Sequence, residues 1–474
     1  MEASVDIEMF LTPGLGDATW LVGSQGEAAL IDPQRDVARF LEAADRRGWS
    51  ITHVLETHCH NDYVSGALEV RAATGAQIVA PARGGYRFPH RAADEGAAVA
   101  LGAISLVAMA TPGHTPEHLA WQIVDGSDTV PQAVLTGGSL LVGTAGRTDL
   151  LGPDHTPGLT DDQFRSLRRL ARLPDGVRVL PTHGAGSFCS AGPAGAGRET
   201  TMGRERATNE LLQTVSKARF QRLLLGGLGR WPAYYGHMAE INRGGAPLVR
   251  GLRAPAALPP AIVADLVARG VWVVDGRDRW AFAEGHLPGS VHVEATESFA
   301  SWVGSVVPFG APIVLVLPED QPGLATDLVV DLSRIGYDAV IGLLEGGVAA
   351  WQASGRVLER MTMTPLASVD ARLAAGVKVL DVRQPTEWRD GIIPGATTVF
   401  LGDLPGRVDE LDRDATWLVL CRSGMRAAIG GSILGAAGIA AEVVGRGGVP
   451  DWVAAHPDHA RAAVAVPSGT ARGA

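Results

Sequence analysis

Cysteine and lysine are both scarce in this chain of 474 residues. The three cysteines, Cys59, Cys189 and Cys421, cannot form the disulfide framework of a small secreted protein, so a reducing cytoplasm is the expected location. Lysine occurs only at Lys217 and Lys378, and the other basic side chains are arginine. The net charge of −10 argues against nonspecific binding of nucleic acid.

The chain also lacks a long hydrophobic run. Its most apolar stretch, 306–317, is interrupted by Pro308, Gly310 and Pro312, so no membrane-spanning helix is expected. The first ten residues lack the basic and apolar regions of a secretion signal. The hydrophobic content of 46% is ordinary for a soluble globular protein, and the length suggests about two to four domains.

The most informative stretch is 57–63, which places His58, His60 and Asp62 within five residues. A predicted strand, 51–56, precedes it, and a predicted helix, 64–73, follows it. Imidazole and carboxylate are ligands that zinc and Fe(II) accept, so the pattern favours a metal site. A polar surface loop would explain the two histidines if they stood alone.

Three further predicted strands end in similar turns. The strand 104–108 leads to His114, the strand 133–135 leads to the turn 136–139, and the strand 177–180 leads to His183. Candidate ligands at several strand ends make a chance distribution of histidines improbable.

Taken in order, the pieces THCHNDY, TPGHTP, TGGSLL with GRTD, and PTHGAGSFC resemble the metallo-β-lactamase fold, a four-layer αββα sandwich. The sequence resembles most the persulfide dioxygenase branch of that fold, over residues 1–250, including a predicted helical tail at 199–242. The resemblance implies one Fe(II) held by two histidines and one aspartate. His58 and His114 match the histidines, but Gly138 stands where the aspartate belongs. Tyr63 replaces a histidine of the dinuclear hydrolases, so a second metal ion is not expected.

Several ligand sets therefore stay open. His58, His60 and His114 could form a three-histidine site, while Asp62 and His183 could orient a water or supply a ligand. The ion could be Fe(II) or zinc, or there could be none and the histidines would form a hydrogen-bonded cluster. By resemblance Arg147 lies near the substrate pocket, with a surface salt bridge to Asp149 as the alternative.

A Gly- and Pro-rich linker follows residue 243, and beyond it the sequence repeats itself. The matched segments are 271–277 with 377–383, 282–289 with 388–395, and 344–351 with 445–452. The two copies, 258–357 and 364–458, alternate apolar strands with helices, which predicts two domains with parallel sheets covered on both faces.

The second copy contains a buried strand, a short loop and a helix over residues 417–427. The strand would deliver Cys421 to a loop whose N–H groups and flanking arginines favour the nucleophilic thiolate. Such a thiolate can accept a sulfane sulfur. The candidate catalytic residues are Cys421, Arg422, Ser423, Gly424, Met425 and Arg426. An ordinary buried cysteine is the alternative.

Both copies resemble rhodanese domains. The pieces DVR, GIIPGA and CRSGMR carry the resemblance, which implies sulfur transfer at Cys421 and a candidate substrate-binding arginine at Arg383. Ile392 departs from the family, where histidine is frequent. The first copy has LPEDQ, 317–321, in place of the cysteine loop. It is therefore expected to be catalytically inactive and to serve as a spacer or packing module.

The expected function is sulfane-sulfur metabolism, joining a dioxygenase-like domain with a degraded iron site to a sulfurtransferase. Glutathione persulfide and thiosulfate are the expected kinds of substrate, and no nucleic acid or membrane partner is expected. A homodimer stays open. One alternative is a sulfurtransferase with a non-catalytic N-terminal scaffold, and another is a zinc hydrolase acting on thioesters. The small, polar tail 460–474 is expected to be disordered.

Overall fold

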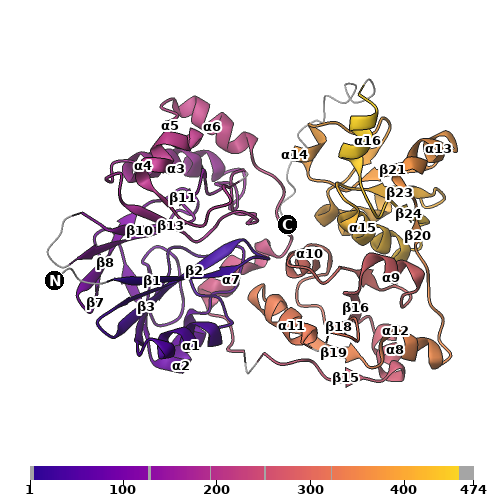
Figure 1. Cartoon of the computed structure of the whole chain (residues 1–474), viewed down its shortest axis with the longest axis horizontal. Coiled ribbons are helices and arrows are strands. Elements are labelled where there is room, and N and C mark those ends of the chain that lie inside the picture. The colour runs from indigo at the N-terminus through magenta and orange to yellow at the C-terminus, as the bar shows by residue number, and fades with distance from the viewer. Residues whose placement is uncertain (1–4, 126–129, 193, 250–251, 322, 458–474) are drawn as a thin grey trace. The chain divides into compact units, whose positions relative to one another are not determined.

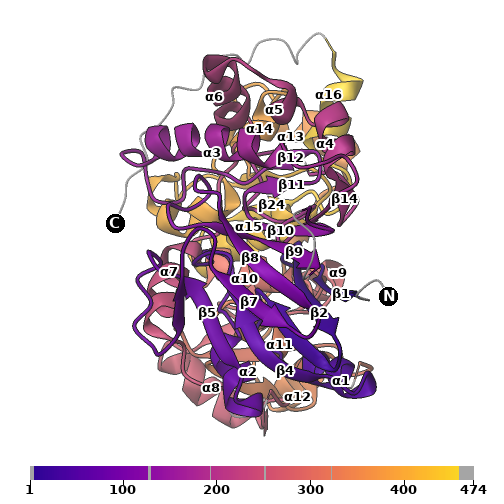
Figure 2. The ribbon, with the colours of Figure 1, turned by 90° about the vertical axis from the view of Figure 1, so that its left-hand side faces the viewer.

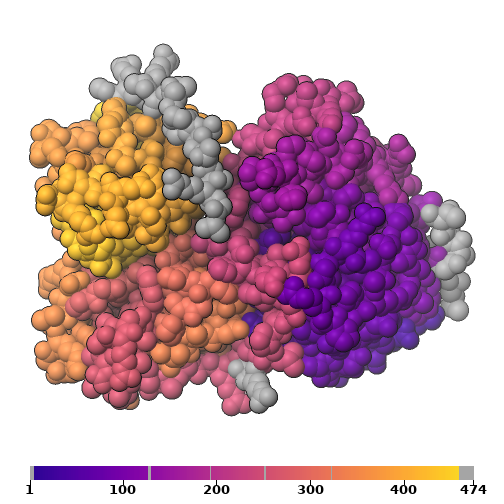
Figure 3. Space-filling view, turned by 180° about the vertical axis from the view of Figure 1, so that it is seen from behind, coloured from indigo at the N-terminus to yellow at the C-terminus, as the bar shows by residue number. Residues whose placement is uncertain are grey.

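The computed structural model describes residues 5–125, 130–192, 194–249, 252–321 and 323–457 (Figure 1). It forms two compact units, the first from the described residues of 1–229 and 235–250 and the second from those of 230–234 and 251–457. In Figure 3 the surface of the first unit has the colours of the N-terminal half of the chain, and the surface of the second unit has those of the C-terminal half. The tail 460–474, where disorder is expected, lies outside the described residues.

Two six-stranded sheets make up the centre of the first unit. The first sheet runs in sequence order through β1 (Asp6–Thr12), β2 (Asp17–Ser24), β3 (Glu27–Ile31), β4 (Ser50–Leu55), β5 (Gln77–Pro81) and β6 (Arg91–Ala93). The second has the order β14 (Thr200–Thr201), β13 (Arg178–Pro181), β10 (Ala133–Gly137), β9 (Leu119–Asp125), β8 (Ile104–Ala110) and β7 (Ala98–Leu101). A small hairpin joins β11 (Leu140–Leu141) to β12 (Thr144–Ala145).

Helices cover the outer faces of both sheets (Figure 2). α1 (Ala38–Arg46) and α2 (Ala67–Thr74) pack on the first sheet, and α3 (Thr156–Leu170), α5 (Glu210–Gln213) and α6 (Lys217–Gly226) share a core with the second. Two more helices belong to this unit, α4 (Met202–Thr208) and α7 (Tyr235–Gly244). The predicted helix 64–73 begins later than expected, at Ala67, because Ser65 is bridged to Gln34 instead.

Strand alternation sorts side chains between the layers. On β2, Trp20 and Val22 face the core between the two sheets, while Leu21 between them faces the helices. On β10, Leu135 faces the same inner core and Val134 faces the outer helices. Because successive strand residues point to opposite faces, a fully apolar strand serves two cores at once. This arrangement gives four layers, αββα.

The second unit contains two five-stranded sheets, in which the neighbouring strands of the described residues run parallel. The first has the order β15 (Ala257–Leu258), β19 (Val340–Leu344), β18 (Ile313–Val316), β16 (Trp272–Asp275) and β17 (Val291–His292). The second has the order β20 (Thr362–Met363), β24 (Ala441–Val443), β23 (Trp417–Leu420), β21 (Lys378–Asp381) and β22 (Thr397–Thr398). The two sheets have the same topology, as expected for a sequence repeat.

Helices surround each of these sheets. The first copy has α8 (Pro260–Ala268), α9 (Arg279–Glu284), α10 (Phe299–Val306), α11 (Leu324–Arg334) and α12 (Gly347–Ala353). The second has α13 (Val369–Ala374), α14 (Pro385–Trp388), α15 (Met425–Ala436) and α16 (Val449–Ala455), with 3₁₀ turns η1 (Leu366–Ser368), η2 (Leu401–Gly406) and η3 (Val408–Glu410). The predicted fold class, an αββα sandwich followed by two α/β domains with parallel sheets, is confirmed. In the part of the chain that the structure describes, no helix combines the length and the apolar character needed to span a bilayer.

Candidate metal centre and cysteine loop

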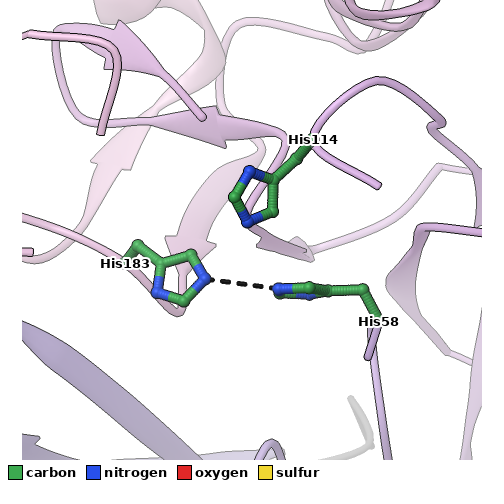
Figure 4. A group of neighbouring side chains, drawn as sticks. All are labelled: His58, His114 and His183. Atoms are coloured by element: carbon green, nitrogen blue, oxygen red, sulfur yellow. Dashed lines mark hydrogen bonds between the residues drawn. The ribbon is translucent and has the colours of Figure 1, made fainter. Parts of the chain in front are cut away.

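Three histidines from three different strand ends meet inside the first unit. His58 follows β4, His114 lies in the turn between β8 and β9, and His183 follows β13. All three are buried, and the candidate ligand atoms of their rings lie within 4.8 Å of one another. Figure 4 shows the three rings facing a common point, with the Nε2 atoms of His58 and His183 3.3 Å apart.

Each ring is held through its other nitrogen. The Nδ1 atom of His58 lies 2.8 Å from the Thr57 hydroxyl, which itself donates to Asp32 at 2.7 Å, so the imidazole is left to donate to that oxygen. His114 Nδ1 donates to the carbonyl oxygen of Arg147 at 2.7 Å. With Nδ1 carrying the proton, Nε2 offers its lone pair to the centre, as in histidines that bind metal ions.

His183 is fixed in the same manner by carboxylates. Its Nδ1 lies 2.8 Å from Asp17 Oδ1 and 3.1 Å from Asp62 Oδ2, so its Nε2 also faces the other two rings. The Nε2 atom of His114 has no hydrogen-bond partner within the described residues. Three converging Nε2 atoms, of which that of His114 has no partner, fit a cation at this point once His183 has lost its proton.

The protonation of the three rings follows from their surroundings. Burial lowers the pKa of His58 well below its ordinary value and that of His114 to about 3, so both rings are neutral and able to bind a metal ion. Burial acts in the same direction on His183, but the charges of Asp62 and Asp17 outweigh it and raise the pKa of His183 to about 10. A metal ion that binds His183 therefore displaces a proton from it.

His60 lies beside His58 but is paired with two carboxylates. Its Nε2 lies 3.2 Å from a carboxylate oxygen of Asp32 and 3.2 Å from one of Glu56, and 3.0 Å from the hydroxyl of Tyr63. Burial would lower the pKa of His60, but Asp32 and Glu56 raise it well above its ordinary value. His60 still belongs to two further groups of possible ligands, one with Asp32 and His58 and one with Asp62 and His183. In this arrangement the three-histidine group contains His183 where the sequence suggested His60.

The backbone at Gly138 is packed closely against the histidines. A Cβ atom at this position would overlap with the ring of His114, and one at Gly137, where φ is +53°, would overlap with the Thr57 side chain. The Gly138 N–H donates to His118 Nε2 at 2.9 Å, and His118 Nδ1 is held by Thr111. The loop therefore lies against the histidines so closely that a side chain at position 138 does not fit.

Arg147 forms the expected pair with Asp149, at 2.7 and 2.8 Å, but it is buried and not on the surface. Its guanidinium also donates to the carbonyl oxygens of Phe188 and Gly229. Because its own carbonyl oxygen accepts from His114, the ion pair fixes a backbone segment that orients a candidate ligand.

The predicted helical tail supports the histidine loop. Asn242 on α7 donates to the carbonyl oxygens of His60 and Tyr63, each at 2.8 Å, and accepts from Ser65 N at 2.9 Å. One buried amide thus satisfies three backbone groups of the loop.

Sequence reasoning missed several residues that support the centre, namely Asp17, Asp32, Glu56, His118 and Asn242. Asp32 accepts hydrogen bonds from Thr57 N, Thr57 Oγ1 and Thr182 Oγ1 and has the unusual φ of +53°. An acidic residue before a proline at a strand end, Asp32-Pro33, was the available signal for it.

In the second unit, β23 delivers Cys421 to a short loop, and α15 begins at Met425. The Gly424 N–H donates to Cys421 Sγ at 3.1 Å. Gly424 has φ +99°, and a Cβ there would overlap with the Gly445 carbonyl, so the loop requires glycine. Arg422 and Ser423 are exposed, whereas Cys421 is buried. The expected cradle therefore contains at least one N–H directed at the sulfur.

Two nearby arginines have defined partners. Arg426 pairs with Glu387 on α14, at 2.6 and 2.8 Å. The buried Arg383 pairs with Asp381 and donates to the Gly391 carbonyl at 2.7 Å. Arg277 of the first copy makes the same bonds, to Asp275 and to the Gly285 carbonyl. Because the copy without cysteine repeats the arrangement, Arg383 supports the fold of the repeat.

The domains implied by these features are confirmed by comparison with known families. Residues 12–183 match the model of the metallo-beta-lactamase superfamily, and residues 260–354 and 366–455 each match the rhodanese-like domain. The chain therefore contains one metallo-β-lactamase domain and two rhodanese-like domains, both kinds of which indicate an enzyme.

Individual relatives match about a third of the chain. The chain is 36% identical over 160 residues to a hydroxyacylglutathione hydrolase of Methylococcus capsulatus, covering 33% of this chain and 57% of that protein. It is 32% identical over 182 residues to a hydroxyacylglutathione hydrolase of Cereibacter sphaeroides, covering 37% and 66%. The chain thus spans less than two thirds of the length of these relatives.

Among solved structures, a metallo-beta-lactamase from Staphylococcus aureus is similar with a TM-score of 0.65 and 28% identity. The similarity covers 72% of this chain and 99% of that chain, which is more of this chain than the first domain contains. Together with the cluster of histidines and aspartates, the metallo-β-lactamase fold indicates a bound metal ion such as iron or zinc.

Proposed function

We propose that the protein is a sulfur-handling enzyme whose second rhodanese-like domain carries sulfane sulfur on Cys421. The observation that carries the proposal is the hydrogen bond from Gly424 N–H to Cys421 Sγ at the start of the twelve-residue helix α15. An N–H donor and a helix N-terminus both stabilise an anionic sulfur. The same donor would serve the thiolate and the persulfide anion that replaces it.

The transfer step follows from this geometry. The Cys421 thiolate attacks the outer sulfur of a donor such as thiosulfate, so that a new S–S bond forms as the donor's S–S bond breaks. Sulfite leaves with the electron pair of the broken bond, and Cys421 is left as a persulfide. A thiolate or cyanide acceptor then attacks the outer sulfur, and the Cys421 thiolate returns. Glutathione persulfide would act as donor in the same manner, with glutathione thiolate leaving.

The test is sulfur transfer from thiosulfate and from glutathione persulfide by the full-length protein. Cys421→Ser should abolish transfer and the mass increase of one sulfur atom on the peptide that contains position 421. Cys189→Ser is the matched control, because Cys189 is buried in the first unit, and it should retain transfer. Undiminished transfer by Cys421→Ser would overturn the proposal.

For the first domain we propose a metal-dependent site that acts on a thiol-derived substrate, with His58, His114 and His183 as the ligands. A metal ion held there would supply Lewis acidity and lower the pKa of a coordinated water. The third imidazole in place of a carboxylate favours zinc, since three histidines and a water complete a tetrahedron. The named relatives, which are hydroxyacylglutathione hydrolases, support a thioester of glutathione as the substrate class.

Two alternatives compete with this proposal for the first domain. One is persulfide oxidation at Fe(II), and the other is a scaffold that binds no metal ion. Iron oxygenases of this kind use two histidines and one carboxylate. The His58–His114–His183 group contains no carboxylate, whereas the two groups that include His60 have that composition. The deciding experiment measures metal content after purification without oxygen or chelators, then thioester cleavage and oxygen uptake with glutathione persulfide. Zinc with thioester cleavage supports the proposal, iron with oxygen uptake establishes the rival, and protein without metal establishes the scaffold.

Tethering gives a reason for joining the domains. A persulfide or thiol released at one site meets the other at a higher effective concentration than free domains would provide. Thiols and persulfides of low molecular weight are accordingly the proposed substrates and products of both sites.

A further inference from the structure

The first rhodanese-like domain lacks a nucleophile, yet one of its side chains reaches the cysteine loop of the second. Arg279 is the first residue of α9, and its Nη1 lies 3.4 Å from the carbonyl oxygen of Ser423 and 3.4 Å from that of Gly445. Both domains belong to the same compact unit. A domain that served only as a spacer would not need to place a cation at this loop.

The two carbonyl groups lie on either side of Gly424. Ser423 is its predecessor, and the Gly445 carbonyl packs so closely that a Cβ on Gly424 would overlap with it. Arg279 therefore joins the cysteine loop to the loop that follows β24. At 3.4 Å each contact is long for a hydrogen bond, so the attraction is mainly that of a shared charge for two carbonyl dipoles.

The peptide group between Ser423 and Gly424 links this cation to the sulfur. Its carbonyl oxygen faces Arg279, and its N–H is the donor to Cys421 Sγ at 3.1 Å. In a trans peptide the C=O and N–H bonds point in opposite directions, and the described chain contains no cis peptide. A cation that holds the carbonyl oxygen thus also directs the N–H at the sulfur and polarises it.

Arg279 is itself held in place. Glu294 accepts from its Nε at 3.0 Å and from its Nη2 at 2.6 Å, which leaves Nη1 directed at the loop. The side chains of both partners are largely buried, at 19% and 17% exposed, so the pair is fixed more firmly than a surface salt bridge. Because the pair is neutral overall, its influence on the sulfur is local and passes through the peptide group.

We propose that Arg279 is a positioning residue for sulfur transfer, which fixes the Gly424 N–H on Cys421 from the domain that has no nucleophile. This inference rests on the proposed sulfur transfer at Cys421. It assigns the first rhodanese-like domain a part in the site, beyond the packing role expected from its sequence. The charged side chains on the elements around Cys421 are those of Arg422, Arg426, Glu387, Asp381, Arg383 and Arg446, and they remain the same in the variants below.

The test is the rate at which iodoacetamide alkylates Cys421 in the full-length protein, followed by mass spectrometry from pH 5 to pH 10. Arg279→Gln should slow alkylation about tenfold at pH 6, the effect expected when a hydrogen bond to a charged group is weakened, and the deficit should disappear at high pH. Arg279→Lys should give an intermediate rate and keeps the test open if the glutamine variant does not fold. Arg356→Gln, in the same domain but beside Trp351 and Ser354, should match the wild type.

The kcat/KM for sulfur transfer should show the same dependence on pH. A purely structural role would lower activity equally at every pH and would leave the alkylation profile of the folded protein unchanged, and either result overturns the inference. A third outcome is that Arg279→Gln slows alkylation at pH 6 but the wild-type protein transfers no sulfur. That outcome would uphold the positioning role of Arg279 and refute the proposed function.

Discussion

The Nε2 atoms of His58 and His183 face each other at 3.3 Å, although the two residues lie 125 positions apart in the sequence. Each ring has its Nδ1 atom engaged, one by the Thr57 hydroxyl and the other by Asp17. Because Asp62 and Asp17 raise the pKa of His183 to about 10, its Nε2 carries a proton near neutral pH and donates it to the lone pair of His58 Nε2. A metal ion that displaced this proton would take the same position between the two nitrogen atoms, within reach of His114.

The first prediction concerns this pair. His183→Gln should reduce bound metal at least tenfold, because one of three ligands is lost, and the supporting residues around a metal site alone change affinity by about 10–100-fold. Metal content by mass spectrometry after dialysis checks it. His155→Gln, in a histidine that precedes α3, is the control and should keep its metal. Equal metal in both variants would show that His183 is not a ligand.

A second prediction is that restoring the missing aspartate does not restore an iron oxygenase. Gly138→Asp places a Cβ against the ring of His114, so the variant should lose about 1–3 kcal/mol of stability through overpacking and should show no oxygen uptake with glutathione persulfide. Thermal unfolding and an oxygen electrode check both parts. Gly158→Asp on α3, where a Cβ meets nothing within 4 Å, is the matched control. Oxygen uptake gained by Gly138→Asp would contradict the account of the loop.

These two predictions depend on features that the sequence did not reveal. The strand ends that carry His58, His114 and His183 could be predicted, because apolar strands that end in turns have a clear pattern. Which ring nitrogen faces the centre could not, since it depends on distant acceptors such as Asp17 and the Arg147 carbonyl. Sequence spacing favoured His60 because it is near His58, but its Nε2 is paired with the carboxylates of Asp32 and Glu56.

The cysteine loop was more accessible to sequence reasoning. Its strand, glycine and helix are contiguous, so local geometry places Gly424 N–H on Cys421. The contribution of Arg279 was hidden, because it begins a helix in a domain whose own loop has no cysteine. Contacts between two copies of a repeat cannot be predicted from the sequence pattern of either copy alone.

A third prediction addresses the loop glycine. Gly424→Ala should lower sulfur transfer by at least tenfold, because alanine at φ +99° is strained and its Cβ would meet the Gly445 carbonyl. Steady-state kinetics with thiosulfate check the loss. Gly435→Ala near the end of α15 is the control, since its Cβ has open space and alanine stabilises a helix by up to about 1 kcal/mol relative to glycine. Full activity of Gly424→Ala would show that the loop does not need this conformation.

The fourth prediction concerns acid and the second unit. His292 on β17 is buried, donates through Nε2 to the Arg277 carbonyl at 2.9 Å, and has no partner for Nδ1 among the described residues. Burial lowers the pKa of His292 to about 4, below the ordinary value of 6.5 that it regains on unfolding. The unfolded chain therefore takes up a proton first as the pH falls. The loss of stability that His292 causes should develop between pH 6.5 and pH 4 and level off below, by roughly 3 kcal/mol in all.

His292→Gln isolates this effect, because its amide can still donate to the Arg277 carbonyl but does not titrate. The free energy of unfolding by urea should fall less steeply in the variant than in the wild type between pH 6.5 and pH 4.5. The comparison cancels the other buried histidines, which both proteins share. A constant difference between the two proteins over this range would mean that His292 takes up its proton without regard to folding, and that its ring is not sealed from water in the native state.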